Sequence, residues 1–355
     1  MREIYDQRVT DARSGFRGEE GMDIIGSLVK STLGEQPHNS ASKGSTTYTE
    51  GGQSNGLTEA EVFGNSFIMI LAGHETTANV MHFALMELAI NPSSQRRVQG
   101  DIDNIFGVSA PEDWHYDTLI NPCLGGILGA VVNEVLRLLP PVVTIFKSVK
   151  ADRDQHIVVD GKEVLLSKGS LVYINVVGVH QNPKYWPSLG PSEVSGRVDD
   201  LEDFIPERWL VTGQSKDLKE DTPESPEEEE FGGFTGTNTA GQLFRPPRGA
   251  FVPFSEGPRS CLGRRLAQIE IVAVLAVIFQ QYSVELAVEE WATDDEVAKM
   301  AKNERVELYK KAQEKARKTI DTATTKLTLK LNDGPGYIPV RIVRKGEERF
   351  IHLIG

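Results

Sequence analysis

The sequence predicts a mainly α-helical fold with small β-sheets, and three segments support this prediction. Residues 57–90 are apolar between a polar start and an Asn91-Pro92 stop, which is the pattern of one long helix. Residues 266–277 form a second apolar, helix-forming run. Residues 158–175 alternate between apolar and polar side chains, which indicates short β-strands.

The long helix at 57–90 carries its own start signal. Thr58 and Glu61 have the spacing of a capping box. At about 1.5 Å per residue the helix would be about 50 Å long, which is enough to cross a domain. Residues 67–71 are apolar on nearly every side of the helix, so we expect them to be buried.

Residues 72–77, Ala-Gly-His-Glu-Thr-Thr, interrupt the apolar part of this helix. Small residues let a ligand lie against the backbone. A hydroxyl and a carboxylate in an apolar core cost free energy unless they are used or satisfied. The residues alone leave two interpretations, a segment that contacts a ligand or a kinked core helix with a local Thr-to-backbone bond. We expect His74 to be a packing or rim residue rather than a metal ligand.

The hairpin and the terminal strands follow from local signals. Asp160-Gly161 is a hairpin turn signal within residues 158–175. Residues 171–174 are typical of a strand, and residues 326–331 and 338–344 predict two terminal strands.

Residues 254–263 place one cysteine, Cys261, in a loop that Pro258 stiffens and two glycines loosen. Two arginines and the start of the helix that follows favour the thiolate form of the side chain. A thiolate held in this way is a metal ligand or a nucleophile. The alternative is a buried structural cysteine.

The pattern Phe-x-x-Gly-x-Arg-x-Cys-x-Gly resembles the haem-binding loop of the cytochrome P-450 haem-thiolate monooxygenases, and its fixed positions are filled by Phe254, Gly257, Arg259, Cys261 and Gly263. The resemblance implies that Cys261 is the axial ligand of the haem iron. It also implies that Phe254 packs near the sulfur and that Arg259 pairs with a haem propionate. The two glycines would let the backbone approach the porphyrin closely.

The Ala-Gly-His-Glu-Thr-Thr run resembles the oxygen-activation segment of the same family. The resemblance implies that Ala72 and Gly73 contact the cofactor. It further implies that Thr76 hydrogen-bonds dioxygen or its water, and that Glu75 relays protons toward it.

Three charged residues match the family's buried ion network. Glu134 and Arg137 share one helix face, and Arg208 lies in the run Phe-Ile-Pro-Glu-Arg-Trp. The resemblance implies that all three lie behind the haem loop, where such a network fixes geometry more than it adds net stability. Lys147 stands where many members carry a propionate-pairing arginine, and a lysine pairs only as a point charge.

The motifs occur in family order over roughly residues 57–345, and the long insertions most resemble a filamentous-fungal member. We therefore expect a cytochrome P-450 fold that is incomplete at its N-terminus, with residues 57–355 as the haem-binding core. Residues 1–56 would be partial helices and a flexible linker. We expect a disordered acidic insertion at 211–248 and one exposed, inserted helix at 289–320.

Composition limits the class of protein. The net charge of −13 argues against nucleic acid as a partner. The two cysteines, Cys123 and Cys261, do not suggest a disulfide framework, and we expect Cys123 to be a packed free thiol. No apolar run reaches about eighteen residues, and the N-terminus is too charged for a secretory signal. The chain alone would thus be soluble or cytoplasmic, whereas the full-length family member would lie on the cytosolic face of the endoplasmic reticulum through an N-terminal anchor.

The resemblance implies a haem-dependent monooxygenase that uses dioxygen and electrons from NADPH through a reductase. The reductase would dock near Arg259, Arg264 and Arg265. The substrate would be small and apolar, in secondary or xenobiotic metabolism.

Two alternatives stay open at this point. The chain could be a truncated, non-catalytic remnant that lacks the substrate-recognition region. It could also be a thiol-dependent, non-haem enzyme that uses Cys261 with His74 or His180.

Overall fold

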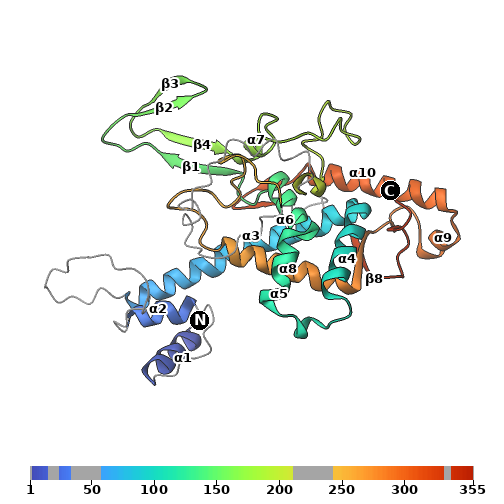
Figure 1. The fold of residues 1–355 in the computed structure, drawn as a ribbon, viewed down its shortest axis with the longest axis horizontal. Helices are drawn as coiled ribbons and strands as arrows, with labels where there is room; N and C mark the ends of the chain where they lie inside the picture. The colour runs from blue at the N-terminus through green and yellow to red at the C-terminus, as the bar shows by residue number, and fades with distance from the viewer. Residues whose placement is uncertain (1, 15–23, 33–56, 211–242, 332–336, 355) are drawn as a thin grey trace. The chain divides into compact units, whose positions relative to one another are not determined.

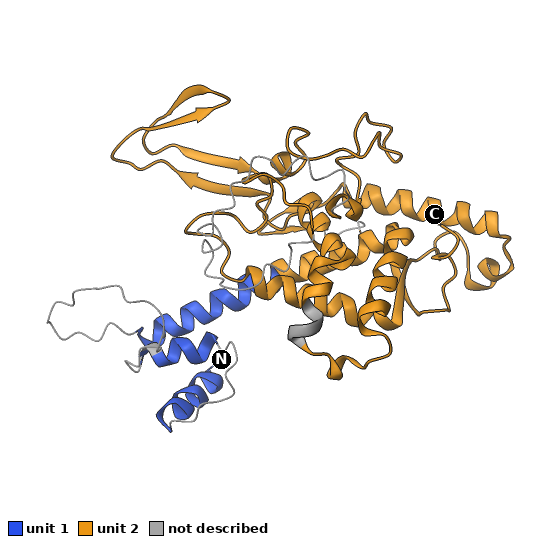
Figure 2. Cartoon of the chain, viewed as in Figure 1, with its two compact units in different colours: residues 1–75 blue, residues 76–355 orange. Residues whose placement is uncertain are grey.

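The computed structural model describes residues 2–14, 24–32, 57–210, 243–331 and 337–354. Helices dominate it, and each sheet has two strands, so the predicted fold class is confirmed (Figure 1). The chain forms two compact units, residues 1–75 and 76–355 (Figure 2). The division of the chain into a linker up to residue 56 and a haem-binding core from residue 57 stays a prediction.

The first unit contains α1 (Arg2–Arg13), α2 (Ile24–Thr32) and the first half of α3 (Glu59–Ile90). The Tyr5 and Phe63 rings lie 5.1 Å apart, and Arg2 pairs with Glu59 at 2.6 Å. Val62 is buried in this unit.

The expected burial of residues 67–71 is wrong for most of the stretch. Phe67, Ile68, Ile70 and Leu71 are each more than two-fifths exposed. An all-round apolar sequence predicts that a helix needs a cover, but it does not specify which segments supply that cover. Within the described residues the cover is incomplete.

Both ends of α3 follow from its local sequence. The capping box is present, because the Thr58 N–H donates to the Glu61 carboxylate at 2.7 Å and the Glu61 N–H donates to the Thr58 hydroxyl at 3.3 Å. The helix ends at Ile90, where the Asn91 side chain donates to the Glu87 carbonyl at 2.8 Å. The start lies two residues later than predicted, and the stop is where Asn91-Pro92 placed it.

Four further helices build the core of the second unit: α4 (Pro92–Phe106), α5 (Tyr116–Gly125), α6 (Ile127–Leu138) and α8 (Arg264–Gln281). Helix α6 packs against α4, α5 and α8, and a short 3-10 turn, η1 (Pro111–Asp113), follows α4 (Figure 1). Buried apolar side chains at helical spacing fill the space between these helices, among them Val131, Val135, Val272, Leu275 and Phe279. Cys123 is fully buried and free, as predicted, and burial raises the pKa of its thiol to about 12.

The four sheets within the described ranges are all antiparallel pairs. Strands β2 (Gln155–Val159) and β3 (Lys162–Leu166) form the predicted hairpin, whose turn residues Asp160 and Gly161 both have positive φ. The other pairs are β1 (Thr144–Ser148) with β4 (Leu171–Asn175), β5 (Tyr282–Leu286) with β8 (Val340–Arg344), and β6 (Thr324–Thr325) with β7 (Leu329–Lys330). The predicted strand at 326–331 is thus only the short β7.

The segment 289–320 holds two helices instead of the single exposed helix that was expected. Helix α9 spans Asp294–Lys299 and α10 spans Lys302–Ile320. Each begins with its own cap, since Glu296 accepts from the Thr293 N–H and Glu304 accepts from the Ala301 N–H. Helix α10 is also not merely a surface helix, because it buries one face, which includes Leu308, Tyr309, Ala312, Ala316 and Ile320.

The remaining elements connect the core to the loop regions. Helix α7 (Val176–His180) follows β4, and a 3-10 turn, η2 (Pro206–Trp209), precedes the acidic segment. Residues 211–242 of the expected insertion lie outside the described residues. Its last part is ordered core, because Leu243 and Phe244 are buried and Leu243 pairs with Leu210. Among the described residues, no helix is both long enough and apolar enough to span a bilayer.

A buried carboxyl group, Glu87, lies in the last turn of α3 and makes stability pH-dependent. Its side chain is 8% exposed and accepts a hydrogen bond from the Asn91 amide at 3.1 Å. Burial raises the pKa of the Glu87 carboxyl from 4.5 to about 7, and the nearby Arg317 opposes this only in part. The folded chain therefore holds this proton more tightly than the unfolded chain does.

We expect Glu87 to lower the free energy of unfolding as the pH rises from about 4.5 to about 7. Because the folded pKa is the raised one, the stability present below the unfolded pKa is lost as the pH passes through the folded pKa. At about 1.4 kcal/mol for each pKa unit, the loss is about 3 kcal/mol at most. Urea unfolding of the wild type and of Glu87→Gln at pH values below and above this window measures it. The variant should lose this part of the pH dependence, and an unchanged profile would contradict the assignment.

Candidate active site

The cysteine loop, residues 252–263, is held by its own backbone hydrogen bonds immediately before α8. The Ser255 N–H donates to the Val252 carbonyl at 3.0 Å, and the Ser260 N–H donates to the Gly257 carbonyl at 2.9 Å. The Cys261 N–H donates to the Phe254 carbonyl at 2.8 Å. These bonds fix the backbone and leave the Cys261 side chain exposed with a free thiol.

The loop has room for a flat, closely approaching group. Gly257 has a φ of +85°, and a Cβ added there would meet nothing within 4 Å. A Cβ added to Gly263 would meet only the Cys261 sulfur, at 4.0 Å. An exposed thiol between two open glycine positions therefore fits a haem, whose iron prefers a thiolate ligand in this class of site.

Arginines surround the cysteine loop, but their environments differ. The Arg264 guanidinium lies 5.6 Å from the centre of the Phe254 ring. Burial lowers the pKa of Arg264, and Glu256 and Cys261 oppose that shift. Arg259 is exposed, Arg265 is half-buried, and Phe254 packs against the core. The predicted propionate partner, Arg259, is thus exposed to solvent, as is Arg264.

Glu134 is the centre of a buried ion cluster behind this region. Arg137 donates to both carboxylate oxygens of Glu134 at 2.8 Å, in a two-point contact. The Trp209 indole N–H donates to the same carboxylate at 2.8 Å, and the Ile205 N–H does so at 3.1 Å. Arg208 approaches it at 3.5 Å. The structure therefore brings Glu134, Arg137 and Arg208 together, and all three side chains are fully buried.

The remaining N–H groups of Arg137 and Arg208 donate mainly to backbone carbonyls. Arg137 donates to the carbonyl of Leu201 at 2.7 Å. Arg208 donates to the carbonyl of Pro187 at 2.6 Å, and to both the carbonyl and the carboxylate of Asp200, at 2.9 and 3.1 Å. Asp200 and Trp209 were not among the predicted site residues. The cluster thus fixes residues 187–209, an irregular segment that ends in the 3-10 turn η2 and has few backbone bonds of its own.

The four predicted residues of the oxygen-activation segment lie on α3 without a break in the helix. Ala72 and Gly73 are exposed, whereas Glu75 and Thr76 are half-buried. The boundary between the two units falls between Glu75 and Thr76. Their roles toward a cofactor stay predictions.

Lys147 lies on β1 opposite Val172 of β4, with its side chain exposed. The role of Lys147 as a propionate partner also stays a prediction.

His180 is a residue that the sequence suggested only for an alternative chemistry. It is fully buried at the end of α7. Its Nδ1 lies 3.1 Å from the Arg137 carbonyl oxygen, and its Nε2 accepts the Val252 N–H at 2.9 Å. Both ring nitrogens are occupied, so His180 is not available as a base for Cys261. Its position after a strand and before Gln-Asn-Pro is the only sequence signal that could have singled it out.

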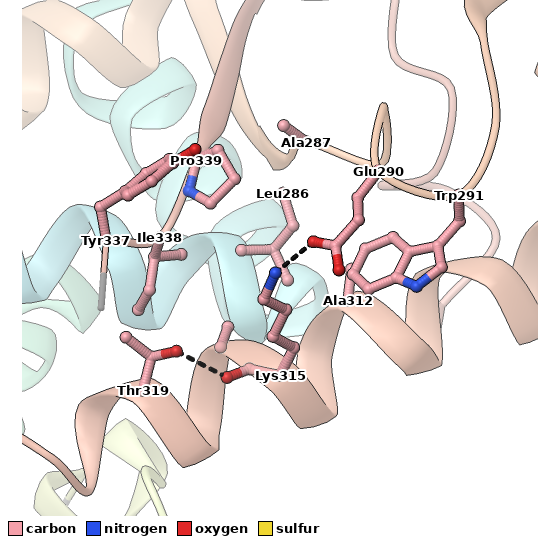
Figure 3. Close-up of a pocket in the computed structure, with 11 residues that line it drawn as sticks. Leu286, Ala287, Glu290, Trp291, Ala312, Lys315, Thr319, Tyr337, Ile338 and Pro339 are labelled. Atoms are coloured by element: carbon pink, nitrogen blue, oxygen red, sulfur yellow. Dashed lines mark hydrogen bonds and ion pairs between the residues drawn. The ribbon is translucent and has the colours of Figure 1, made fainter. Parts of the chain in front are cut away.

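A small cavity in the second unit is not a substrate site. It has a volume of about 20 Å³, which is room for about one water molecule. Lys315 and Glu290 form an ion pair at its rim, and Thr319 donates to the Lys315 carbonyl at 2.9 Å (Figure 3). The rest of the lining is mostly apolar and includes Leu286, Trp291, Ala312, Ile338 and Pro339.

The fold is mainly helical, a free thiol lies in a glycine-containing loop before a long helix, and a Glu-Arg-Arg cluster is buried. These are the features expected of a haem-thiolate type of protein. The family model for cytochrome P-450 matches residues 30–308. The chain therefore belongs to the cytochrome P-450 family, which confirms the resemblance.

Curated relatives include fungal and mammalian proteins. A cytochrome P-450 monooxygenase of Arthrobotrys oligospora is 32% identical over 277 residues, 77% of this chain and 43% of the relative. Cytochrome P-450 3A13 of Mus musculus is 30% identical over 64% of this chain and 35% of its own length. The monooxygenase prx9 of Penicillium rubens is 29% identical over 66% of this chain and 37% of its own length. The chain thus spans less than half the length of these relatives.

Proposed function

We propose that this chain carries the haem-binding part of a monooxygenase that inserts one atom of dioxygen into an organic substrate. The observation that carries the proposal is the free, exposed thiol of Cys261 in a loop that its own backbone bonds hold open. The match to the cytochrome P-450 family supports it. When bound, the haem would supply the activation of dioxygen.

The five motif residues of the loop each have a part in this proposal. The Cys261 thiolate holds the haem iron, and Gly257 and Gly263 leave the space that the ring needs beside the backbone. Phe254 packs near the sulfur and tunes the potential of the iron, while Arg259 is exposed and pairs with a propionate in the proposal. Lys147 is a second propionate partner in the proposal.

Thr76 and Glu75 handle protons. The Thr76 hydroxyl donates a hydrogen bond from its Oγ1, and the Glu75 carboxylate passes protons to that hydroxyl. Ala72 and Gly73 have small side chains, so a flat group and a small molecule can lie close to the helix backbone there. All four residues lie on consecutive turns of α3.

The substrate class and partners follow from the same reasoning. Ile68 and Leu71 on α3 present apolar surface, which favours a small apolar substrate, in secondary or xenobiotic metabolism. Electrons would come from NADPH through a reductase that docks near Arg259, Arg264 and Arg265. We propose the cytosolic face of the endoplasmic reticulum as the location of the full-length enzyme.

The test is the carbon monoxide difference spectrum of the reduced chain after expression with added haem. We expect one haem per chain and the red-shifted Soret band of a thiolate-ligated haem. Cys261→Ala should abolish that band, because Ala provides no ligand atom. Cys123→Ala is the matched control, since it removes the other free thiol, which is fully buried, and should keep the band. Absence of haem uptake by the wild type, or an unchanged band in Cys261→Ala, would refute the proposal.

A further inference from the structure

His180 connects two parts of the second unit that are far apart in the sequence. On one side it meets the last turn of α6, where its Nδ1 lies 3.1 Å from the Arg137 carbonyl oxygen. On the other side its Nε2 lies 2.9 Å from the backbone nitrogen of Val252, the first residue of the cysteine loop. The Phe251 ring covers the imidazole at 5.1 Å.

The two contacts determine the protonation of the ring. A backbone N–H can only donate, so Nε2 of His180 must be the acceptor for Val252. The proton of a neutral imidazole then resides on Nδ1, where it donates to the Arg137 carbonyl. A second proton on Nε2 would remove the acceptor and leave the Val252 N–H buried without a partner.

The surroundings of His180 favour this neutral form. Burial, aided by the neighbouring Arg137 guanidinium, lowers the pKa of the His180 imidazole from 6.5 to about 4, although hydrogen bonds to the backbone of Arg137 and Leu136 oppose the shift. That guanidinium donates to the His180 carbonyl at 3.2 Å and is itself paired with Glu134. Arg137 and His180 thus hold each other through both their backbones and their side chains.

Val252 is where the cysteine loop is attached. Its side chain is buried, and its carbonyl accepts the Ser255 N–H at 3.0 Å. The next turn of the loop closes when the Cys261 N–H donates to the Phe254 carbonyl at 2.8 Å. A shift of Val252 would therefore move Phe254 and Ser255, and with them the carbonyl that holds the Cys261 backbone.

We propose that His180 is a positioning residue that ties the buried Glu134–Arg137 pair to the start of the cysteine loop and so sets the position of the Cys261 thiol. As far as that thiol holds a haem, the inference rests on the proposed function. His180 does not touch the thiol, and its hydrogen bond to the cysteine loop is the one from the Val252 N–H.

Two conservative variants, His180→Gln and His180→Asn, distinguish the hydrogen bond to Val252 from the packing of the His180 side chain. A glutamine side chain can place an oxygen where Nε2 stands, so His180→Gln keeps an acceptor for the Val252 N–H. An asparagine side chain reaches only the position of Nδ1, so His180→Asn keeps the contact with Arg137 and loses the one with Val252. His180→Ala loses both.

Hydrogen exchange of the Val252 amide in the full, haem-free chain is the first readout. We expect His180→Asn and His180→Ala to exchange about tenfold faster at Val252 than the wild type, because a net hydrogen bond is lost. His180→Gln should stay close to the wild type. Equal behaviour of the Gln and Asn variants, or protection at Val252 that survives His180→Ala, would overturn the proposal, as would a Gln variant that does not fold.

The fraction of haem with the red-shifted carbon monoxide band is the second readout. We expect it to fall in His180→Asn and to recover in His180→Gln, and the reverse order would overturn the proposal. If the wild type takes up no haem, the proposed function fails, while the exchange comparison still decides on His180.

Discussion

Glu134→Gln is expected to lower the free energy of unfolding by about 3–5 kcal/mol, because removal of one partner strands buried charge. Glu134, Arg137 and Arg208 have no exposed side-chain surface at their contacts. The substitution keeps the shape of the side chain and removes its charge. It also turns one acceptor into an amide N–H that would face donors from Arg137 and Trp209.

Urea unfolding followed by circular dichroism measures this effect, and Glu307→Gln is the matched control. Glu307 also pairs with a basic residue three positions away, Lys310, at 2.9 Å, but both side chains are more than half exposed. Solvent screens such a pair, so we expect little change in its unfolding midpoint. Equal losses in the two variants would show that the buried cluster is not stabilised by its charge.

The ion cluster illustrates what the sequence could predict. The i, i+3 spacing places Glu134 and Arg137 on one helix face, and the structure has them in direct contact. Trp209 and Asp200 complete the cluster through the irregular segment 187–209, which has no periodicity to interpret. Spacing within one helix therefore predicts the Glu134–Arg137 pair. The other partners come from segments that are distant in the sequence and cannot be predicted from local patterns.

The same division holds for the secondary structure. The Thr58–Glu61 box and the Asp160-Gly161 turn are made by neighbours in the sequence, so both could be predicted. Strand β8 instead pairs with β5, more than fifty residues earlier, and no local pattern encodes that choice. Leu243 and Phe244 were assigned to an acidic insertion, because the overall composition of a long segment hides two core-forming residues at its end.

Burial differs from what residue type predicts in two ways: a polar residue can be buried, as His180 is, and apolar residues can be exposed, as most of residues 67–71 are. His180 is polar and fully buried, because two backbone groups satisfy both ring nitrogens. Phe67 and Ile68 are apolar and exposed, because burial depends on the neighbours that are present and not on the side chain alone.

Gly129→Ala is expected to destabilise the chain by about 3 kcal/mol, because an added methyl group has no space between α5 and α6. A Cβ at Gly129 would lie 2.0 Å from the carbonyl oxygen of Leu124 and 2.6 Å from its carbonyl carbon. Both atoms belong to backbone, so no side-chain rotation can relieve the contact. Either α5 or the first turn of α6 must shift.

Gly100→Ala is the matched control and should act in the opposite direction. Gly100 lies within α4, and a Cβ there would meet nothing within 4 Å. Alanine is the better helix former by about 1 kcal/mol, so we expect this variant to be more stable than the wild type. Thermal unfolding of both variants decides the matter, and a stable Gly129→Ala chain would show that α5 and α6 are not in close backbone contact.

The position of Gly129 gives this variant a second expected effect. Helix α6 carries Glu134 and Arg137, and the Arg137 carbonyl accepts from His180. A shift of α6 is therefore transmitted through His180 to Val252 and the cysteine loop. Gly129→Ala should speed hydrogen exchange at Val252 even under conditions where the chain is fully folded, whereas Gly100→Ala should leave it unchanged. Unaltered exchange in a folded Gly129→Ala chain would mean that the loop is positioned independently of α6.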